Sequence, residues 1–367
     1  MSERVGIAVV GLGYWGPNLV RAMHDVDDFD VEWVCDLDAN ALAKIGRRYP
    51  AVRRTTDLDE VLADDDVDAV AIATPVSTHF PLAKRALEAG KHVFVEKPLA
   101  ASTAEAVALA ELAESQQVVL MPGHTFLYSP PVRTIRALID AEDLGDIYFI
   151  SSSRVNLGLH QRDVSVAWDL GPHDFSILRY WLQETPTHLA GTSRSCIIPG
   201  TPDVAFISLE FASETVAQVE LSWLAPSKLR RTTIVGSRKM VVYDDTSNEP
   251  VRLFDSGVML PDPSSFGEYK LSYRTGDIVS PHVSAAEPLV IELADFCHAI
   301  LAGSIPESSA QLGIEVVKMI EACDASFARH GRRVRVGAGR TPARSAALSS
   351  LPTQRLPRNR RPASLHA

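Results

Sequence analysis

A lysine and an Asp–His pair are the residues of this chain best suited to acid–base chemistry. Lys97 lies in the tripeptide Glu96-Lys97-Pro98, which follows a short apolar run and should therefore stand at the carboxyl end of a buried strand. Ligands bind at that edge of open α/β sheets. Asp169 and His173 are spaced to share one face of a helix. A carboxylate beside an imidazole can hold it in one tautomer, and the imidazole can then accept a proton near neutral pH.

A glycine-rich segment upstream predicts a dinucleotide site. Its sequence is Gly11-Leu12-Gly13-Tyr14-Trp15-Gly16, between an apolar run and a helical pattern. Gly11 would permit the tight turn, Gly13 would let the backbone approach a pyrophosphate, and Gly16 would let the helix pack closely on the strand. The free N–H groups and positive dipole end of that helix would then face the phosphates.

Asp36 favours NAD as the cofactor. It ends a second apolar run and lies 20 residues after Gly16. Its carboxylate can accept hydrogen bonds from both hydroxyls of an adenosine ribose, and it would repel a 2′-phosphate. Leu37 follows, with no arginine adjacent to pair such a phosphate. NADP is therefore the less favoured cofactor, and Asp38 is expected to cap the next helix.

A second loop could also reach the cofactor. Ala73-Thr74-Pro75 ends another apolar run, and His79 follows it. The loop could contact the pyrophosphate or the nicotinamide ribose, or it could be a plain turn in which Ser77 or Thr78 caps the next helix. The residues expected to bind the cofactor are Gly11, Gly13, Tyr14, Trp15, Gly16, Asp36, Thr74, Pro75, His79, Glu96 and Lys97.

Apolar runs and helical patterns alternate over the first third of the chain. The runs are Val5–Val10, Val31–Cys35, Ala69–Ala73, His92–Val95 and Val118–Met121. Such alternation predicts a parallel sheet with right-handed crossovers and helices on both faces. Together with the glycine-rich segment, it indicates an N-terminal Rossmann domain.

The pattern changes after about residue 124. Longer stretches then alternate apolar and polar residues, as in a large, mostly antiparallel open sheet. These stretches are Ile147–Val155, Thr187–Ile197, Ala205–Phe211, Thr215–Trp223, Arg231–Gly236 and Lys239–Asp244. Helices are expected at Pro131–Ala141, Trp168–Leu182, Pro288–Ala302 and Gln311–His330. We therefore expect an α/β protein with a Rossmann domain at 1–124, a substrate-binding and oligomerisation domain at 125–338, and a basic, disordered tail at 339–367.

Composition argues against several other classes of protein. The 367 residues carry a net charge of −10, and nine arginines lie in residues 331–367, so the rest holds 27 basic against 46 acidic residues. An acidic body argues against nucleic-acid binding. No apolar run reaches the ~18 residues of a membrane helix. The chain begins without a signal segment and its four cysteines form no CxxC pair, so we expect a cytoplasmic protein with no metal site.

Four motifs make the chain resemble the Gfo/Idh/MocA oxidoreductases, named after glucose–fructose oxidoreductase, inositol dehydrogenase and a rhizopine-catabolism protein. The motifs are the glycine-rich segment, Ala73-Thr74-Pro75 with His79, Glu96-Lys97-Pro98, and Asp169-Leu170-Gly171-Pro172-His173-Asp174. The resemblance covers roughly residues 4–337. It implies a Rossmann domain followed by an α/β domain with a large open sheet, through which members commonly form homodimers or homotetramers.

The resemblance also implies that Lys97, Asp169 and His173 are catalytic. In the expected reaction the hydride of a carbinol passes to nicotinamide while His173 removes the hydroxyl proton. Lys97 hydrogen-bonds the same oxygen and stabilises developing negative charge. Asp169 orients His173 or holds a sugar hydroxyl. Lys97 and His173 could exchange the acid and base roles, and the Lys97–Pro98 peptide could be cis.

The loop before the Asp–His motif is the expected substrate wall. Residues 154–163 gather many hydrogen-bonding groups, which suit a polyhydroxylated or an anionic ligand, although the loop could also be a solvated connector. The residues expected to bind the substrate are Lys97, Arg154, Asn156, Gln161, Asp169 and His173.

Other segments resemble a subgroup that acts on nucleotide-linked sugars. They are the Trp168–Asp174 motif with the loop before it, residues 273–281, and Glu287-Pro288-Leu289. Many other members carry a stretch rich in glycine before the catalytic Asp, where this chain has Val-Ser-Val-Ala-Trp. The preferred hypothesis is an NAD-dependent dehydrogenase acting on ring C3 of a nucleotide-linked sugar, with the reverse reduction also open. The alternatives are an inositol or free-sugar dehydrogenase, and a catalytically silent relative that senses NAD and regulates a partner.

Overall fold

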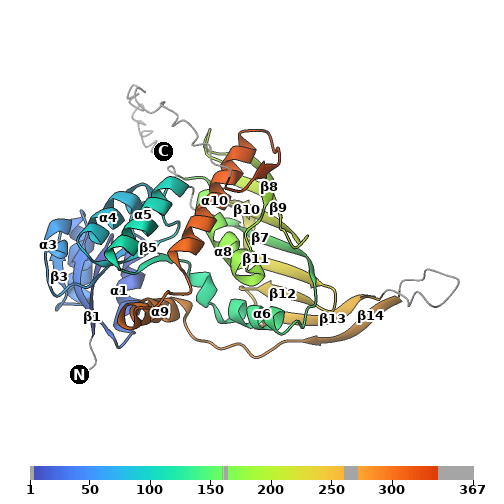
Figure 1. The fold of residues 1–367 in the computed structure, drawn as a ribbon, viewed down its shortest axis with the longest axis horizontal. Helices are drawn as coiled ribbons and strands as arrows, with labels where there is room; N and C mark the ends of the chain where they lie inside the picture. Colours follow the sequence, from blue (N-terminus) through green and yellow to red (C-terminus); the bar gives the residue numbers. More distant parts are fainter. Residues whose placement is uncertain (1–3, 159, 161–163, 260–271, 338–367) are drawn as a thin grey trace, which may run out of the picture.

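Two β-sheets, with helices between them, form the protein (Figure 1). The computed structural model describes residues 4–158, 160, 164–259 and 272–337. The predicted tail at 339–367 therefore lies outside the described residues, and so does the predicted substrate contact Gln161.

The first sheet has six parallel strands in the order β3-β2-β1-β4-β5-β6. Its strands are β1 (Val5–Val10), β2 (Phe29–Cys35), β3 (Arg53–Thr55), β4 (Ala69–Ile72), β5 (His92–Glu96) and β6 (Leu120–Gly123). Every residue of β1 is buried, as expected of a central strand covered on both faces. The strand order reverses between β1 and β4, and ligands bind at the carboxyl ends of the strands at such a point.

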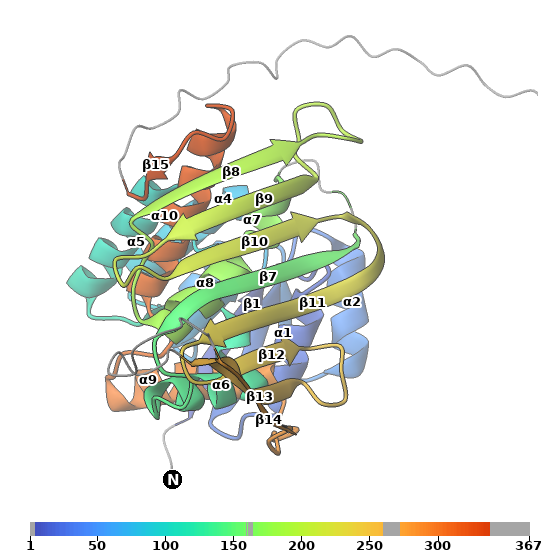
Figure 2. The ribbon, with the colours of Figure 1, turned by 90° about the vertical axis from the view of Figure 1, so that its right-hand side faces the viewer.

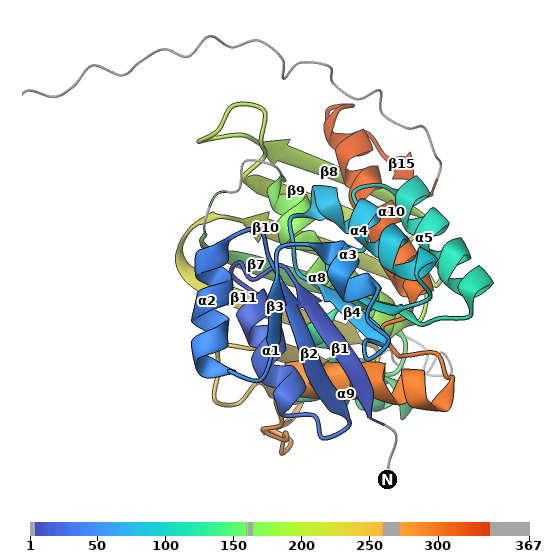
Figure 3. The ribbon, with the colours of Figure 1, turned by 90° about the vertical axis from the view of Figure 1, so that its left-hand side faces the viewer.

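Five helices connect these strands (Figure 3). They are α1 (Gly16–His24), α2 (Ala39–Arg48), α3 (Leu58–Leu62), α4 (Val76–Glu88) and α5 (Thr103–Gln116). The sequence located every strand of this sheet except β3. That strand has three residues, two of them arginines, at the edge of the sheet, so no apolar run marks it. The predicted Rossmann arrangement is confirmed.

The second sheet has nine strands in the order β14-β13-β12-β11-β7-β10-β9-β8-β15. They are β7 (Ile147–Leu157), β8 (His188–Arg194), β9 (Val204–Glu210), β10 (Val216–Ser222), β11 (Leu224–Gly236), β12 (Met240–Asp244), β13 (Val251–Met259), β14 (Ser272–Val279) and β15 (Val334–Arg335). All neighbours pair antiparallel except β7 with β10. The predicted mostly antiparallel sheet is confirmed, and Figure 2 views the face on which no helix lies.

Helices cover the other face of this sheet and connect it to the first domain. They are the short η1 (Thr125–Tyr128), α6 (Pro130–Asp140), α7 (Val166–Asp169), α8 (Gly171–Leu182), α9 (Pro288–Ala302) and α10 (Ala310–Phe327). Helix α10 packs on α5, α8 and β8, so it contacts both domains. Helix α9 packs on α1, η1 and β1, and its Phe296 ring lies 5.8 Å from that of Phe94 in β5.

One sequence prediction needs correction, and two strands of the second sheet were missed. The single helix expected at Trp168–Leu182 is broken at Leu170, because Gly171 has low helix propensity and Pro172 lacks the N–H that would continue the helix. The strands β13 and β14 were not predicted. They form a ribbon that projects from the body of the protein in Figure 1, and much of their surface is exposed, so no apolar face marks them in the sequence.

No helix within the described ranges is both long enough and apolar enough to cross a bilayer.

Candidate active site

The glycine-rich loop between β1 and α1 has the geometry of a pyrophosphate cradle. Gly11 has a φ of 94°, a conformation that side chains other than glycine rarely adopt. A Cβ at Gly16 would lie 1.9 Å from the carbonyl oxygen of Gly11, so only glycine lets the helix approach the turn this closely. A Cβ at Gly13 would meet no atom within 4 Å. The backbone is therefore open on the side where a phosphate would bind, and no side-chain cap occupies the start of α1.

Asp36 closes this loop from the end of β2. Its Oδ2 accepts a hydrogen bond of 2.5 Å from the backbone N–H of Leu12, and its Oδ1 accepts one of 2.7 Å from Asp38. Asp38 in turn caps α2 by accepting from Asn40, as predicted. The carboxylate of Asp36 thus stands directly beside the cradle, where the ribose of a bound dinucleotide would lie.

His79 supports the second loop from beneath. Its side chain is only 1% exposed, and its two ring nitrogens lie 2.9 Å from the carbonyl oxygen of Pro98 and 2.8 Å from that of Thr74. Helix α4 begins at Val76, and the Thr78 hydroxyl bonds back to Thr74 instead of capping the helix. His79 therefore joins the loop after β4 to the segment after β5. Because the His79 ring is buried, it offers no exposed surface for the direct contact with the cofactor that was predicted.

Lys97 and Asp169 bring the two domains together. The ammonium Nζ of Lys97 lies 2.9 Å from the backbone oxygen of Asp169 and 3.4 Å from its carboxylate Oδ1. Trp223 donates from its indole Nε1 to the other carboxylate oxygen, Oδ2, at 3.0 Å. The Lys97–Pro98 peptide is cis, as the sequence analysis allowed. The lysine at the end of β5 thus meets the Asp at the end of α7, as predicted from their positions at the two motifs.

His173 stands near Lys97 in the first turn of α8. Its ring meets the ring of Phe126 edge-on at 5.0 Å, and its Nδ1 is buried without a hydrogen-bond partner among the described residues. Burial lowers the pKa of His173 well below 6.5, and the positive charges of Lys97, Arg154 and Arg230 lower it further. The imidazole is therefore neutral near neutral pH. Leu170 keeps helical backbone angles between α7 and α8. The orientation of His173 by Asp169 stays a prediction.

Arg154, a predicted substrate contact, belongs to a buried ion pair. Its Nε lies 2.5 Å from Oδ2 of Asp174, and the two side chains are 5% and 3% exposed. Ser152 donates to the other oxygen of Asp174 at 2.7 Å, and the Arg154 guanidinium lies over the ring of Phe126. These contacts anchor Asp174 to β7. Arg154 therefore stabilises the start of α8, next to His173.

The remaining substrate wall is only partly described. Asn156 extends from β7, and its Oδ1 is buried without a hydrogen-bond partner in the described part of the chain. The His160 ring lies 5.4 Å from the ring of Trp223, and its Nε2 is 3.8 Å from the carboxylate of Asp203. Asn156 and His160 therefore lie on the side of Trp223 and Asp169, which is compatible with the predicted wall.

Sequence reasoning missed four side chains of this site. His124 and Phe126 follow β6 directly, and their position at the carboxyl edge of the first sheet is a signal that could have found them. Trp223 and Arg230 offered no such signal. Trp223 joins β10 to β11 and Arg230 lies in β11, and both reach the site only because these strands pair with β7. Of these residues, His124 and Trp223 are buried, and Arg230 lies 5.7 Å from the Phe126 ring.

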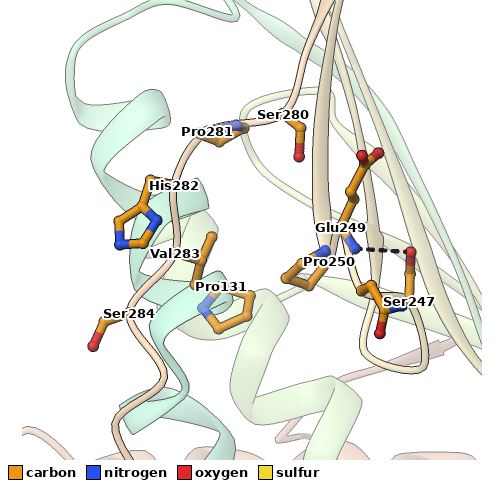
Figure 4. Close-up of a pocket in the computed structure, with 10 residues that line it drawn as sticks. Pro131, Ser247, Glu249, Pro250, Ser280, Pro281, His282, Val283 and Ser284 are labelled. Atoms are coloured by element: carbon orange, nitrogen blue, oxygen red, sulfur yellow. Dashed lines mark hydrogen bonds between the residues drawn. The ribbon is translucent and has the colours of Figure 1, made fainter.

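A separate groove of about 560 Å³ lies at the base of the β13–β14 ribbon (Figure 4). It is lined by Pro131, by residues 247–250 and by residues 280–284. None of the residues expected to be catalytic lines it. Residues 273–281, whose resemblance pointed to a nucleotide-linked sugar, run through this ribbon and groove, away from β5 in Figure 1.

Comparisons with known proteins agree with this geometry. Residues 5–124 match the oxidoreductase family with an NAD-binding Rossmann fold, and residues 132–242 match the GFO/IDH/MocA C-terminal domain. scyllo-Inositol 2-dehydrogenase (NAD(+)) of Bacillus subtilis is 31% identical over 242 residues, which are 62% of this chain and 69% of that protein.

Two further proteins extend the comparison. dTDP-3,4-didehydro-2,6-dideoxy-alpha-D-glucose 3-reductase of Streptomyces violaceoruber is 42% identical over 95 residues, 26% of this chain and 28% of that one. The structure of GenD2 from gentamicin A biosynthesis in complex with NAD superposes with a TM-score of 0.78, at 27% identity, over 92% of this chain and 98% of that one.

The fold and site thus define an oxidoreductase with an NAD-binding Rossmann domain and a second domain that closes the catalytic edge. The chain belongs to the Gfo/Idh/MocA family. The predicted family, its dehydrogenase chemistry and its NAD cofactor are confirmed.

Asp36 provides a test of the cofactor geometry. Replacing Asp36 with Ala should weaken NAD binding about tenfold to a hundredfold, since hydrogen bonds to a charged group contribute ~1.5–3 kcal/mol each. The same change should lower the ratio of the Kd for NADP to the Kd for NAD. Asp38→Ala is the matched control, because that side chain caps α2. Titration of the tryptophan fluorescence with each dinucleotide measures both affinities, and an unchanged NAD/NADP ratio in Asp36→Ala would contradict the assignment.

Arg230 provides a test of the charge around His173. The Arg230→Gln variant lacks one of the cations that lower the pKa of His173, so the imidazole should protonate at a higher pH, by on the order of half a unit. Proton NMR titration of the His173 ring, assigned with a His173→Gln variant, measures this. Arg179→Gln is the control. Arg179 lies on α8, the same helix as His173, but pairs with Glu315. Equal titration of His173 in the wild type and Arg230→Gln would overturn the explanation.

Proposed function

We propose that this oxidoreductase oxidises a secondary hydroxyl of a sugar, at ring C3 of a nucleotide-linked one. The observation that carries the proposal is the meeting of Lys97 with Asp169 beside His173, at the edge of the sheet where the dinucleotide cradle opens. An ammonium and a neutral imidazole next to a hydride acceptor suit the oxidation of a carbinol. Sugar chemistry is also what the names of the similar proteins describe.

Different residues remove the proton and stabilise the developing charge. Bound NAD supplies the hydride acceptor. We assign proton removal to His173, because burial and neighbouring cations keep its imidazole neutral. Lys97 keeps an ammonium that can hydrogen-bond the carbinol oxygen and stabilise the negative charge that develops there. Asp169 and Trp223 hold Lys97 in position, and the Arg154–Asp174 ion pair holds the start of α8.

The preference for a nucleotide-linked sugar rests on fewer observations than the oxidation of a carbinol does. It is supported by the Trp168–Asp174 motif and by the similarity to the dTDP-sugar 3-reductase over part of the chain. An inositol or a free sugar is the second candidate, favoured by the similarity to scyllo-inositol 2-dehydrogenase over a longer stretch. A silent NAD sensor is disfavoured, because such a protein has no need of Lys97 and His173 in one site. The cytoplasmic location and the absence of nucleic-acid and membrane partners also remain predictions.

We also propose a homodimer or homotetramer that forms through the open face of the second sheet. Phe149 and Phe206 are exposed there, and Val216, the partner of Phe149 across β7 and β10, is exposed beside Phe149. Exposed apolar side chains gathered on one face are typical of an interface. The opposite face of the sheet is already covered by α8 and α10.

Charged residues on this face should separate the subunits. The Phe149→Asp/Phe206→Asp double variant would bury two carboxylates in the interface, which is costly, so the sedimentation coefficient should fall to that of a monomer. Ile305→Asp is the control, since Ile305 is exposed outside this sheet. A wild type that sediments as a monomer would refute the proposed assembly.

Lys97 provides the test of the reaction. The wild type should reduce NAD with at least one member of a panel of nucleotide sugars, free sugars and inositols. Lys97→Met should lower kcat about a hundredfold to a thousandfold, because it removes a donor to the developing oxyanion, while the Kd for NAD changes by about threefold or less. NADH absorbance measures turnover. Full turnover in Lys97→Met, or no NADH from the wild type with any substrate, would contradict the proposal.

A further inference from the structure

A buried glutamate on α9 is not explained by the reaction described above. Glu292 is 0% exposed, and its Oε2 accepts a hydrogen bond of 2.6 Å from the Thr125 hydroxyl. Its other oxygen, Oε1, is buried and has no hydrogen-bond partner among the described residues. Among the described residues, no lysine or arginine forms an ion pair with Glu292. Carboxylates that are buried in proteins are normally paired with cations.

Glu96, the residue before Lys97, is a second acid of this region and is half-buried. Its Oε1 is buried without a partner in the described ranges, and its Oε2 accepts a weak hydrogen bond from the Lys97 backbone N–H. The carboxyl group lies against Gly123, where a Cβ would come within 3.3 Å of it. Strand pairing places Glu96 opposite Gly123, two residues before Thr125, whose hydroxyl bonds to Glu292. The charge of Glu96 therefore acts on Glu292.

Two carboxyl groups in this setting cannot both be ionised at neutral pH. Burial opposes the charge on each of them, and the negative charge of one opposes ionisation of the other. Burial raises the pKa of Glu292 well above 4.5, and the charge of Glu96 raises it further. Burial also raises the pKa of Glu96 to about 7, although the positive charge of Lys97 acts in the opposite direction. Glu292 is therefore the member of the pair that keeps a proton.

We propose that Glu292 is a positioning residue of the catalytic edge, protonated in the working enzyme, and that with Glu96 it forms an acid–carboxylate pair that holds one proton behind Lys97. Protonated Glu292 has an O–H that needs an acceptor, and the unpartnered Oε1 of Glu96 is the acceptor that the pair would supply. Above the pKa of Glu96 the pair then carries a single negative charge, and the ammonium of Lys97 balances it. A second negative charge would attract that ammonium away from the substrate oxygen.

The other groups around Glu292 leave this assignment unchanged. Asp295, one turn further along α9, accepts a hydrogen bond from the Tyr128 hydroxyl, and its charge favours the protonated form of Glu292. On the facing helix α1, Arg21 pairs with Glu287 at the start of α9. His124 is buried, and burial lowers its pKa to about 3, so it adds no charge. The indole N–H of Trp15 carries no charge and favours the ionised form of Glu96.

The pH dependence of stability tests the proton directly and needs no substrate. The folded protein keeps a proton on Glu292 that the unfolded chain releases above about pH 4.5. The wild type should therefore lose stability relative to Glu292→Gln as the pH rises above that value. Gln cannot ionise and keeps the Thr125 contact, so its apparent Tm should gain on the order of 5 °C over the wild type between about pH 5 and about pH 8.

Glu321→Gln is the matched control for this experiment. Glu321 also accepts a hydrogen bond of 2.6 Å from a threonine hydroxyl, that of Thr103, but lies on α10 away from Glu96. The difference in Tm between Glu321→Gln and the wild type should stay constant with pH. A constant difference for Glu292→Gln as well would overturn the proposal.

Infrared spectroscopy identifies the protonated group. At about pH 8, above the pKa of about 7 of Glu96, the wild type should still show the C=O band of a buried carboxylic acid, and Glu292→Gln should lack it. In Glu96→Gln the neighbouring negative charge is gone, so the band of Glu292 should disappear at a pH lower by about one unit or more. A band that persists in Glu292→Gln, or one whose titration is unaffected by Glu96→Gln, would overturn the pair.

The effect on Lys97 rests on the proposed function and is measured separately. With a turned-over sugar, loss of the shared proton should lower kcat at high pH in the wild type, and Glu292→Gln should retain its kcat there. An identical fall in both proteins would overturn the positioning role. Absence of turnover in the wild type would instead refute the proposed reaction, while the infrared and stability results would still decide whether Glu292 holds the proton.

Discussion

The contact between Lys97 and Asp169 is the interaction on which the rest of the site depends. It joins the carboxyl end of β5 to the break between α7 and α8, so it sets how the two domains meet. The dinucleotide cradle lies on one side of this contact and His173 on the other. A hydride can pass only between groups held at a short distance, and the enzyme must therefore keep both domains in register at this point.

Most of the neighbouring structure serves to hold that contact in place. Trp223 fixes the Asp169 carboxylate from the second sheet, and His79 ties the loops after β4 and β5 together from below. Arg154 and Asp174 form an ion pair away from solvent, next to His173. A buried ion pair costs free energy to desolvate, so its presence here is better explained by the geometry it imposes than by stability.

The charges of the site follow one rule: each buried polar group must be neutral or paired. His173 is neutral because it is buried near cations, whereas Asp174 is charged because Arg154 pairs with it. The proposed proton on Glu292 follows from the same rule. Both domains contribute to this balance, because α9 returns to the first sheet after the second is complete.

Local signals in the sequence determined the Rossmann domain, NAD as the cofactor and the place of Lys97 at the end of a strand. Glycine spacing and strand-end positions depend on neighbours in the chain, so they can be read from it. Only the tertiary structure decided the helix break at Leu170, the buried ion pair of Arg154, and the approach of Trp223 and Glu292. These features depend on the pairing of β11 with β7 and on the return of α9, contacts between distant segments that no local pattern encodes.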